Sequence, residues 1–79
     1  GHPLSLADMV FTLVGATGRK FVDIPTEDTK KFQNKMLAYM NENYSQLVNT
    51  IEQEKVLEAG TREQILEAID EFKKSYQEG

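Results

Sequence analysis

The sequence predicts an all-α fold, a small antiparallel helical bundle of about four helices. Three observations support this prediction. Apolar residues recur three and four positions apart in several segments. Residues typical of helix starts and stops separate those segments. No stretch alternates apolar and polar residues for long enough to predict a strand.

Length and composition indicate a single globular domain. The chain has 79 residues, of which 39% are hydrophobic and 28% are charged. It contains no cysteine, so neither a disulfide framework nor a thiolate zinc site stabilises the fold. Apolar burial must therefore hold the domain together.

The first helix is expected to follow Ser5, which with Asp8 resembles a capping box. Gly15 and Gly18 bracket its expected end. The apolar residues at helical spacing give its expected core stripe: Leu6, Met9, Val10, Leu13 and Val14.

A turn over residues 18–20 and a short extended piece over 21–24 are expected next, because Pro25 holds the residue before it extended. Thr26 is the expected N-cap of the second helix, with two acidic residues after it in the first turn. One face of that helix carries Phe32, Met36, Tyr39 and Met40.

The second helix is expected to end near Glu42 or Asn43, with a break before Ser45. A short third helix then points Leu47, Val48 and Ile51 inward. Thr61 and Gln64 form another expected capping box, which starts the last helix after Gly60. Its apolar stripe is Ile65, Ala68, Ile69, Phe72 and Tyr76.

No catalytic, cofactor-binding or metal-binding residues are predicted. Residues 15–20 superficially resemble a phosphate loop, but only two residues separate the glycines and Phe21 replaces the metal-binding hydroxyl. We interpret them as a helix end and a turn. His2 is the single histidine and lies at the chain end, and the carboxylates are spread over polar helix faces.

The net charge of −4 argues against nucleic acid as a partner, because such binding depends on basic residues. No apolar run approaches the ~20 residues that span a bilayer, so direct membrane insertion is not expected. Residues 1–2 are interpreted as a tag remnant or disordered N-terminus. Residues 3–79 are expected to form a single helical domain, a fragment of a chain that is longer on its N-terminal side.

An ordered set of short motifs over residues 3–76 resembles the C-terminal domain of the α subunit of F-type ATP synthases. The matches are Pro3-Leu4-Ser5 with "PLSVEEQV", Gly15-Ala16-Thr17 with "AATNGY", Val22-Asp23-Ile24-Pro25 with "LDDIPVE", Lys31-Phe32 and Leu37-Ala38-Tyr39 with "RRFEKEFLEYL", Ile51 and Leu57 with "IRETGKL", and residues 66–74 with "KEAIEEFKK".

Three segments depart from that pattern. Residues 18–21 replace Asn-Gly-Tyr-Leu, which changes the charge of a turn. Residues 44–46 replace His-Pro-Glu and remove a proline helix start. Lys55 replaces the glycine of "TGKL", so the third helix is expected to run further.

The resemblance implies a non-catalytic structural and coupling domain, which packs in the α/β ring around the rotating central stalk during proton-driven ATP synthesis or hydrolysis. Its implied partners are neighbouring β subunits and the central-stalk subunit, at the cytoplasmic face of the bacterial inner membrane. It implies no cofactor in this fragment, since ATP, ADP and Mg belong to a nucleotide-binding domain of the parent subunit. By analogy, the stalk-facing turn carries Gln53, Glu54, Lys55, Glu58, Gly60 and Arg62.

Two other classes of protein stay open at this point. One is a free-standing helical adaptor that receives a partner helix in an apolar groove, for which Phe11, Leu37 and Leu66 lie off the main stripes. The other is a small enzyme, although no acid, base, nucleophile or metal set can be assembled from these residues.

Overall fold

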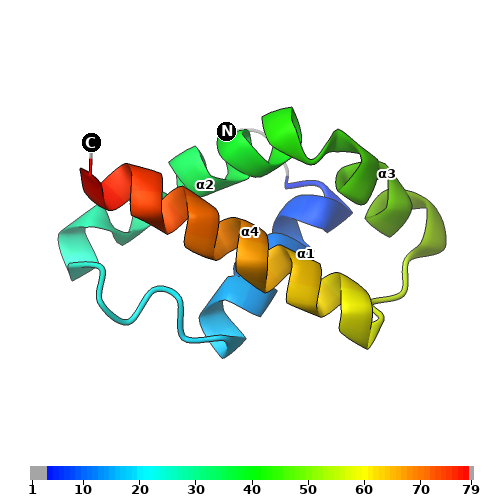
Figure 1. Cartoon of the computed structure of the whole chain (residues 1–79), viewed down its shortest axis with the longest axis horizontal. Coiled ribbons are helices and arrows are strands. Elements are labelled where there is room, and N and C mark those ends of the chain that lie inside the picture. Colours follow the sequence, from blue (N-terminus) through cyan, green and yellow to red (C-terminus); the bar gives the residue numbers. More distant parts are fainter. Residues whose placement is uncertain (1–3, 79) are drawn as a thin grey trace.

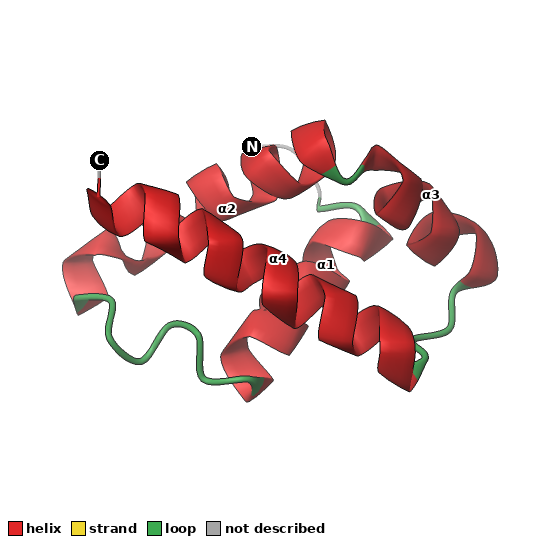
Figure 2. Ribbon diagram, in the orientation of Figure 1, coloured by secondary structure: helices red, strands yellow, loops and turns green. Residues whose placement is uncertain are grey.

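The computed structural model describes residues 4–78, and the surroundings of side chains over 4–76. The expectation for residues 1–2 lies outside this range. Within it, four α-helices are joined by turns, with a short 3-10 helix before the second (Figures 1 and 2). The elements are α1 (Leu6–Thr17), η1 (Thr26–Asp28), α2 (Thr29–Asn43), α3 (Ser45–Glu54) and α4 (Ala59–Glu78). The all-helical prediction is confirmed.

Helices α1 and α2 each contact all three of the other helices. Figure 1 shows α1 crossing behind α4, and α2 running opposite to α4 along the upper edge. Helix α3 lies at the far end of α2, so the turn between α3 and α4 is at one end of the molecule.

The start of α1 confirms its predicted cap. The Ser5 hydroxyl accepts a hydrogen bond from the Asp8 N–H at 3.1 Å. A second N–H group of the first turn, that of Ala7, donates to the Glu52 carboxylate at 3.0 Å. A helix N-terminus has unpaired N–H donors and a partial positive charge, so a carboxylate there is stabilising. This bond ties α1 to α3.

The predicted core stripe of α1 is wrong in part. Met9 and Leu13 are 49% and 61% exposed, whereas Phe11, which was expected off the stripe, is fully buried. Ala7 and Val14 are buried beside Phe11. Apolar residues cover more than half of the circumference of α1, so periodicity alone does not choose the side that packs. The side of α1 that packs into the bundle is the one that carries the aromatic ring of Phe11.

The proposed adaptor groove loses its expected lining for the same reason. Phe11 is inside the core, and both Leu37 and Leu66 are half-buried against it. None of the three residues provides an exposed apolar surface for a partner helix.

The connector between α1 and η1 is a series of turns, so the expected extended piece over 21–24 is wrong. The Ile24 N–H donates to the Phe21 carbonyl at 3.1 Å, and the Ile24 side chain is buried. The turn therefore lets Phe21 and Ile24 both reach the core.

Two ion pairs join this connector to α4. The Lys20 ammonium lies 2.8 Å from the Asp70 carboxylate, and the Lys73 ammonium lies 2.7 Å from the Asp23 carboxylate. Both acids are more than half exposed. Exposed pairs of this kind contribute up to about 1 kcal/mol each.

Two predicted helix starts are also wrong. Thr26 is not an N-cap but the first residue of η1, and α2 begins at Thr29, whose hydroxyl donates to the Pro25 carbonyl at 3.2 Å. Helix α4 begins at Ala59, before the expected Thr61 cap. The first backbone hydrogen bond of α4 already joins the Arg62 N–H to the Glu58 carbonyl at 3.0 Å, so the helix starts before Thr61.

The break between α2 and α3 falls at Tyr44, as predicted. Helix α2 ends at Asn43 and α3 begins at Ser45. Ile51 is buried and both Leu47 and Val48 are half-buried, so the predicted inner face of α3 is confirmed.

The core combines aliphatic layers with a connected set of aromatic rings. Phe32 is fully buried at the centre of the set, and its ring centroid lies 5.1 Å from that of Tyr76, 5.3 Å from Phe72 and 5.7 Å from Phe21. Tyr39 and Tyr44 extend it toward α3 through contacts at 5.3 and 6.0 Å. Met36, Met40, Ile65 and Ile69 are fully buried as well. The predicted apolar faces of α2 and α4 are confirmed.

No helix within residues 4–78 combines the length and apolar character that crossing a lipid bilayer requires.

Candidate interaction surface

The turn between α3 and α4 is the most continuous exposed segment of the described chain. All eight residues over 53–60 are exposed, and Arg62 follows half-buried in the first turn of α4. The structure thus brings the six residues of the predicted stalk-facing turn together at one end of the molecule: Gln53, Glu54, Lys55, Glu58, Gly60 and Arg62.

Lys55 ends α3, so the expectation that α3 runs past this residue is wrong. Helix α3 stops at Glu54, and Lys55 adopts a left-handed conformation with φ 58° and ψ 23°. The Lys55 N–H donates to the Ile51 carbonyl at 2.9 Å, which closes the helix end. Glycine is the usual residue at such a C-terminal position, since a Cβ is disfavoured there. A lysine accepts this conformation at a cost of about 1 kcal/mol.

Replacing Lys55 with glycine is therefore expected to stabilise the fold. Relief of the Cβ clash outweighs the added freedom of the unfolded chain, for a net gain of about 0.5–1 kcal/mol. Urea denaturation of the purified chain measures this. Lys55→Ala is the matched control, because it removes the charge and keeps the Cβ. If both variants are equally stable, the left-handed cap is not the cause.

The tip of the turn is apolar as well as charged, which sequence reasoning missed. Val56 and Leu57 are 65% and 40% exposed, between Lys55 and Glu58. The missed signal was an adjacent Val-Leu pair outside any apolar stripe. The turn therefore combines a small apolar contact surface with charged residues on both sides of it.

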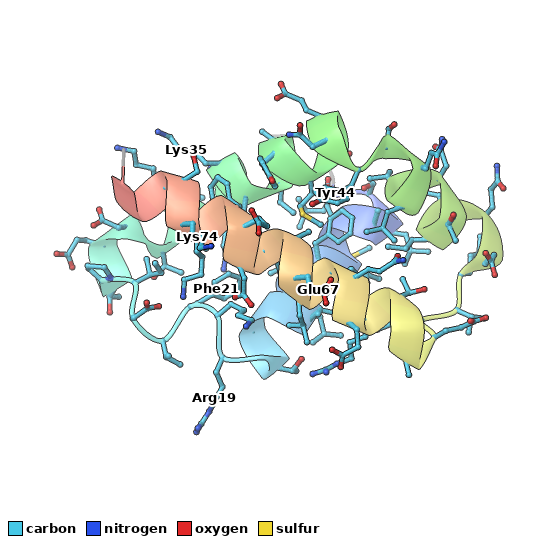
Figure 3. All side chains as sticks on the ribbon, viewed as in Figure 1. Arg19, Phe21, Lys35, Tyr44, Glu67 and Lys74 are labelled. Atoms are coloured by element: carbon cyan, nitrogen blue, oxygen red, sulfur yellow. The ribbon has the colours of Figure 1, made fainter. Side chains whose placement is uncertain are left out.

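A second surface feature is a groove of about 870 Å³ between the α2–α3 junction and α4. Figure 3 labels Tyr44 on one wall and Glu67 on the other. The lining of the groove combines apolar surface with hydroxyl, amide and carboxylate side chains, such as those of Ser45, Thr50, Gln64 and Glu71.

Beside this groove, burial raises the pKa of the Tyr39 phenol above its ordinary value of 10.0, and Tyr44 contributes further. Tyr39 is therefore neutral near pH 7. The folded state loses stability from this group only as the pH rises above 10.0, where the unfolded chain releases the proton more readily.

The glycine-containing segment at 15–20 is a helix end, as the sequence indicated. Gly15 is buried inside α1, and the N–H groups of Gly18, Arg19 and Lys20 donate to helix carbonyls at 2.8–3.1 Å. A phosphate loop needs such groups free and placed at a helix N-terminus. Here they are paired at a C-terminus, whose partial charge repels phosphate. Arg19, at φ 61°, points away into solvent (Figure 3).

Among the residues that the structure describes, no three His, Cys, Asp or Glu side chains converge on a position that would hold a metal ion.

The sequence matches the family described as ATP synthase alpha/beta chain, C terminal domain, over residues 1–72. The chain belongs to this family. It is similar to ATP synthase subunit alpha of Clostridium botulinum (strain Eklund 17B / Type B), with 36% identity over 74 residues, or 94% of this chain and 15% of the relative. ATP synthase subunit alpha of Thermobifida fusca (strain YX) is 29% identical over 75 residues, or 95% of this chain and 14% of the relative.

This member of the ATP synthase alpha/beta C-terminal domain family thus spans about one seventh of the length of those relatives. No solved structure gives a significant match. The family confirms the sequence-based resemblance over most of the chain.

Proposed function

We propose that this chain is the non-catalytic structural and coupling domain of an ATP synthase α subunit. In this role it packs beside β subunits in the α/β ring, around the rotating central stalk. ATP, ADP and Mg bind in a separate nucleotide-binding domain of the same subunit. The complex is attached to the cytoplasmic face of the bacterial inner membrane, where it makes or hydrolyses ATP. Family membership and two similar subunit alpha sequences support this proposal.

The observation that carries the coupling role is the exposed α3–α4 turn. Eight consecutive exposed residues project from one end of a body whose core is closed by α1, α2 and α4. The Glu52 bond to the N-terminus of α1 anchors α3 at 3.0 Å, directly before this turn. A contact loop mounted on a packed body transmits force to that body.

The composition of the turn fits a contact that is repeatedly made and released. Glu54, Lys55 and Glu58 keep it hydrated, so adhesion to a moving surface is weak. Val56 and Leu57 give the same tip a small apolar contact. A mixed surface of this kind resembles a transient interface rather than a permanent one.

Charge reversal at Glu54 and Glu58 tests the role in the assembled ATP synthase. The two exposed charges together contribute roughly 0.5–1 kcal/mol, so the double Lys variant is expected to change the rate of ATP synthesis by about two- to fivefold. Torque in single-molecule rotation should change in parallel.

The control reverses Glu27 and Glu42, two exposed acids outside the turn, and so makes the same change in net charge. A second variant, Val56→Ser with Leu57→Ser, tests the apolar tip. The coupling role is discarded if synthesis and torque match the control in both turn variants. Failure of the wild-type domain to enter an α/β ring would discard the proposal as a whole.

A further inference from the structure

The outer side of α1 is apolar, opposite the side that carries Phe11. Met9 and Leu13, one helical turn apart, are 49% and 61% exposed. Leu4, just before the helix, is 53% exposed, and Ala16 continues the same side of the helix. Asp8 is the one charged residue of α1. We call Leu4, Met9, Leu13 and Ala16 the outer α1 face.

The other helices do not share this property. Of the large hydrophobic side chains described, none within α2, α3 or α4 is classed as exposed. Their outer sides carry charged and amide groups instead, such as Lys35, Asn49 and Glu63. A helix that is apolar on opposite sides is typical of a position buried on both. Helix α1 therefore has the composition of a central helix, although the described chain covers only one of its sides.

We propose that the outer α1 face is covered by the segment of the same polypeptide that precedes this domain. The inference rests on the proposed function, because it takes the chain as the C-terminal domain of a full-length α subunit. The similar subunits are about seven times longer than this chain, and the family that it matches is described as a C terminal domain, so a large preceding segment is available in such a subunit.

The position of the face favours this occupant over a neighbouring subunit. Leu4 belongs to the face and lies on the N-terminal side of α1, so in a full-length subunit a preceding segment is tethered next to the face. Tethering gives such a segment a high effective concentration at the face. The near absence of charge favours a permanent contact, since obligate interfaces are the more hydrophobic ones.

The three methionines allow a test without substitution. Met36 and Met40 are fully buried, whereas Met9 is half exposed in the described chain. The full-length subunit, purified alone, is treated with hydrogen peroxide and the sulfoxide at each methionine is followed by mass spectrometry. We expect Met9 to oxidise as slowly as Met36 and Met40, at least about tenfold slower than in the urea-unfolded subunit. Rapid oxidation of Met9, with the other two protected, overturns the proposal.

A cysteine at Leu13 gives an independent readout. In a full-length subunit lacking other cysteines, maleimide labelling of Leu13→Cys is compared with Asn34→Cys, an exposed polar position of α2. We expect at least about tenfold slower labelling at position 13 in the free subunit. Equal rates in the free subunit overturn the proposal, and slow labelling only in the assembled ring assigns the face to a neighbour.

The two proposals fail separately. Protection of Met9 and of position 13 is measured in the free subunit, whereas the coupling role is measured by ATP synthesis and torque in the complex.

Discussion

Phe32→Ala is expected to remove a large part of the folding stability of the purified chain. Phe32 is fully buried, and its ring contacts those of Phe21 in the connector after α1 and of Phe72 and Tyr76 on α4. Truncation of a buried phenylalanine costs about 3–5 kcal/mol, because apolar contacts are lost and a cavity stays behind. A 79-residue chain has a total stability of roughly 4–12 kcal/mol. The loss is therefore a large part of the whole.

Urea denaturation followed by circular dichroism measures this effect, with Asn34→Ala as the matched control on an exposed position of the same helix. The control should differ from the wild type by less than about 0.5 kcal/mol. Phe32→Leu should restore most of the lost stability, because it refills much of the cavity. A Phe32→Ala variant within about 1 kcal/mol of the wild type would show that the aromatic set is not the centre of the core.

Sequence periodicity predicted the helices of this fold well, and the reason is physical. The stripes on α2 and α4 are narrow and bordered by charged residues, so only one face of each helix can be buried. Phe32, Met36 and Met40 confirm this on α2, as Ile65 and Ile69 do on α4. The break at Tyr44 was equally visible, because residues with low helix propensity surround it.

Helix starts were predicted less well, because a capping residue is only a local preference. Thr26 and Thr61 both have the right chemistry for an N-cap, yet helical structure already begins at Thr26 and Ala59. Backbone hydrogen bonds from Asp28 and Arg62 to residues three and four positions earlier extend the two starts. Tertiary packing outweighs a cap that contributes about 1 kcal/mol.

The stalk-facing turn was placed by analogy, and its conformation was not readable from composition. Lys55 ends α3 through backbone geometry that glycine normally provides, so a helix-favouring residue was mistaken for a helix continuation. The aromatic set is invisible in sequence for another reason. Phe21, Phe32 and Phe72 lie far apart along the chain, and only the fold brings their rings together.

A pair of substitutions in the purified chain distinguishes the buried side of α1 from its exposed side by their effects on stability. Phe11→Ala is expected to cost about 3–5 kcal/mol, because Phe11 is fully buried, whereas Leu13→Ala is expected to cost less than about 0.5 kcal/mol, because Leu13 is 61% exposed. The two residues are neighbours on one helix and both are large and apolar. Thermal and urea unfolding of the two variants measure the difference directly.

The predicted stripe made the opposite assignment, with Leu13 inside and Phe11 outside. Equal losses for the two variants, or a larger loss for Leu13→Ala, would therefore restore the periodicity-based interpretation and remove the outer α1 face as an open surface. If the expected order is found, repeating Leu13→Ala in the full-length subunit gives a second comparison. There a cost of about 2 kcal/mol or more is expected, because a covered leucine loses its contacts on truncation. Leu13 then contributes little to the stability of the isolated domain but clearly to that of the full-length subunit, as burial of both sides of α1 requires.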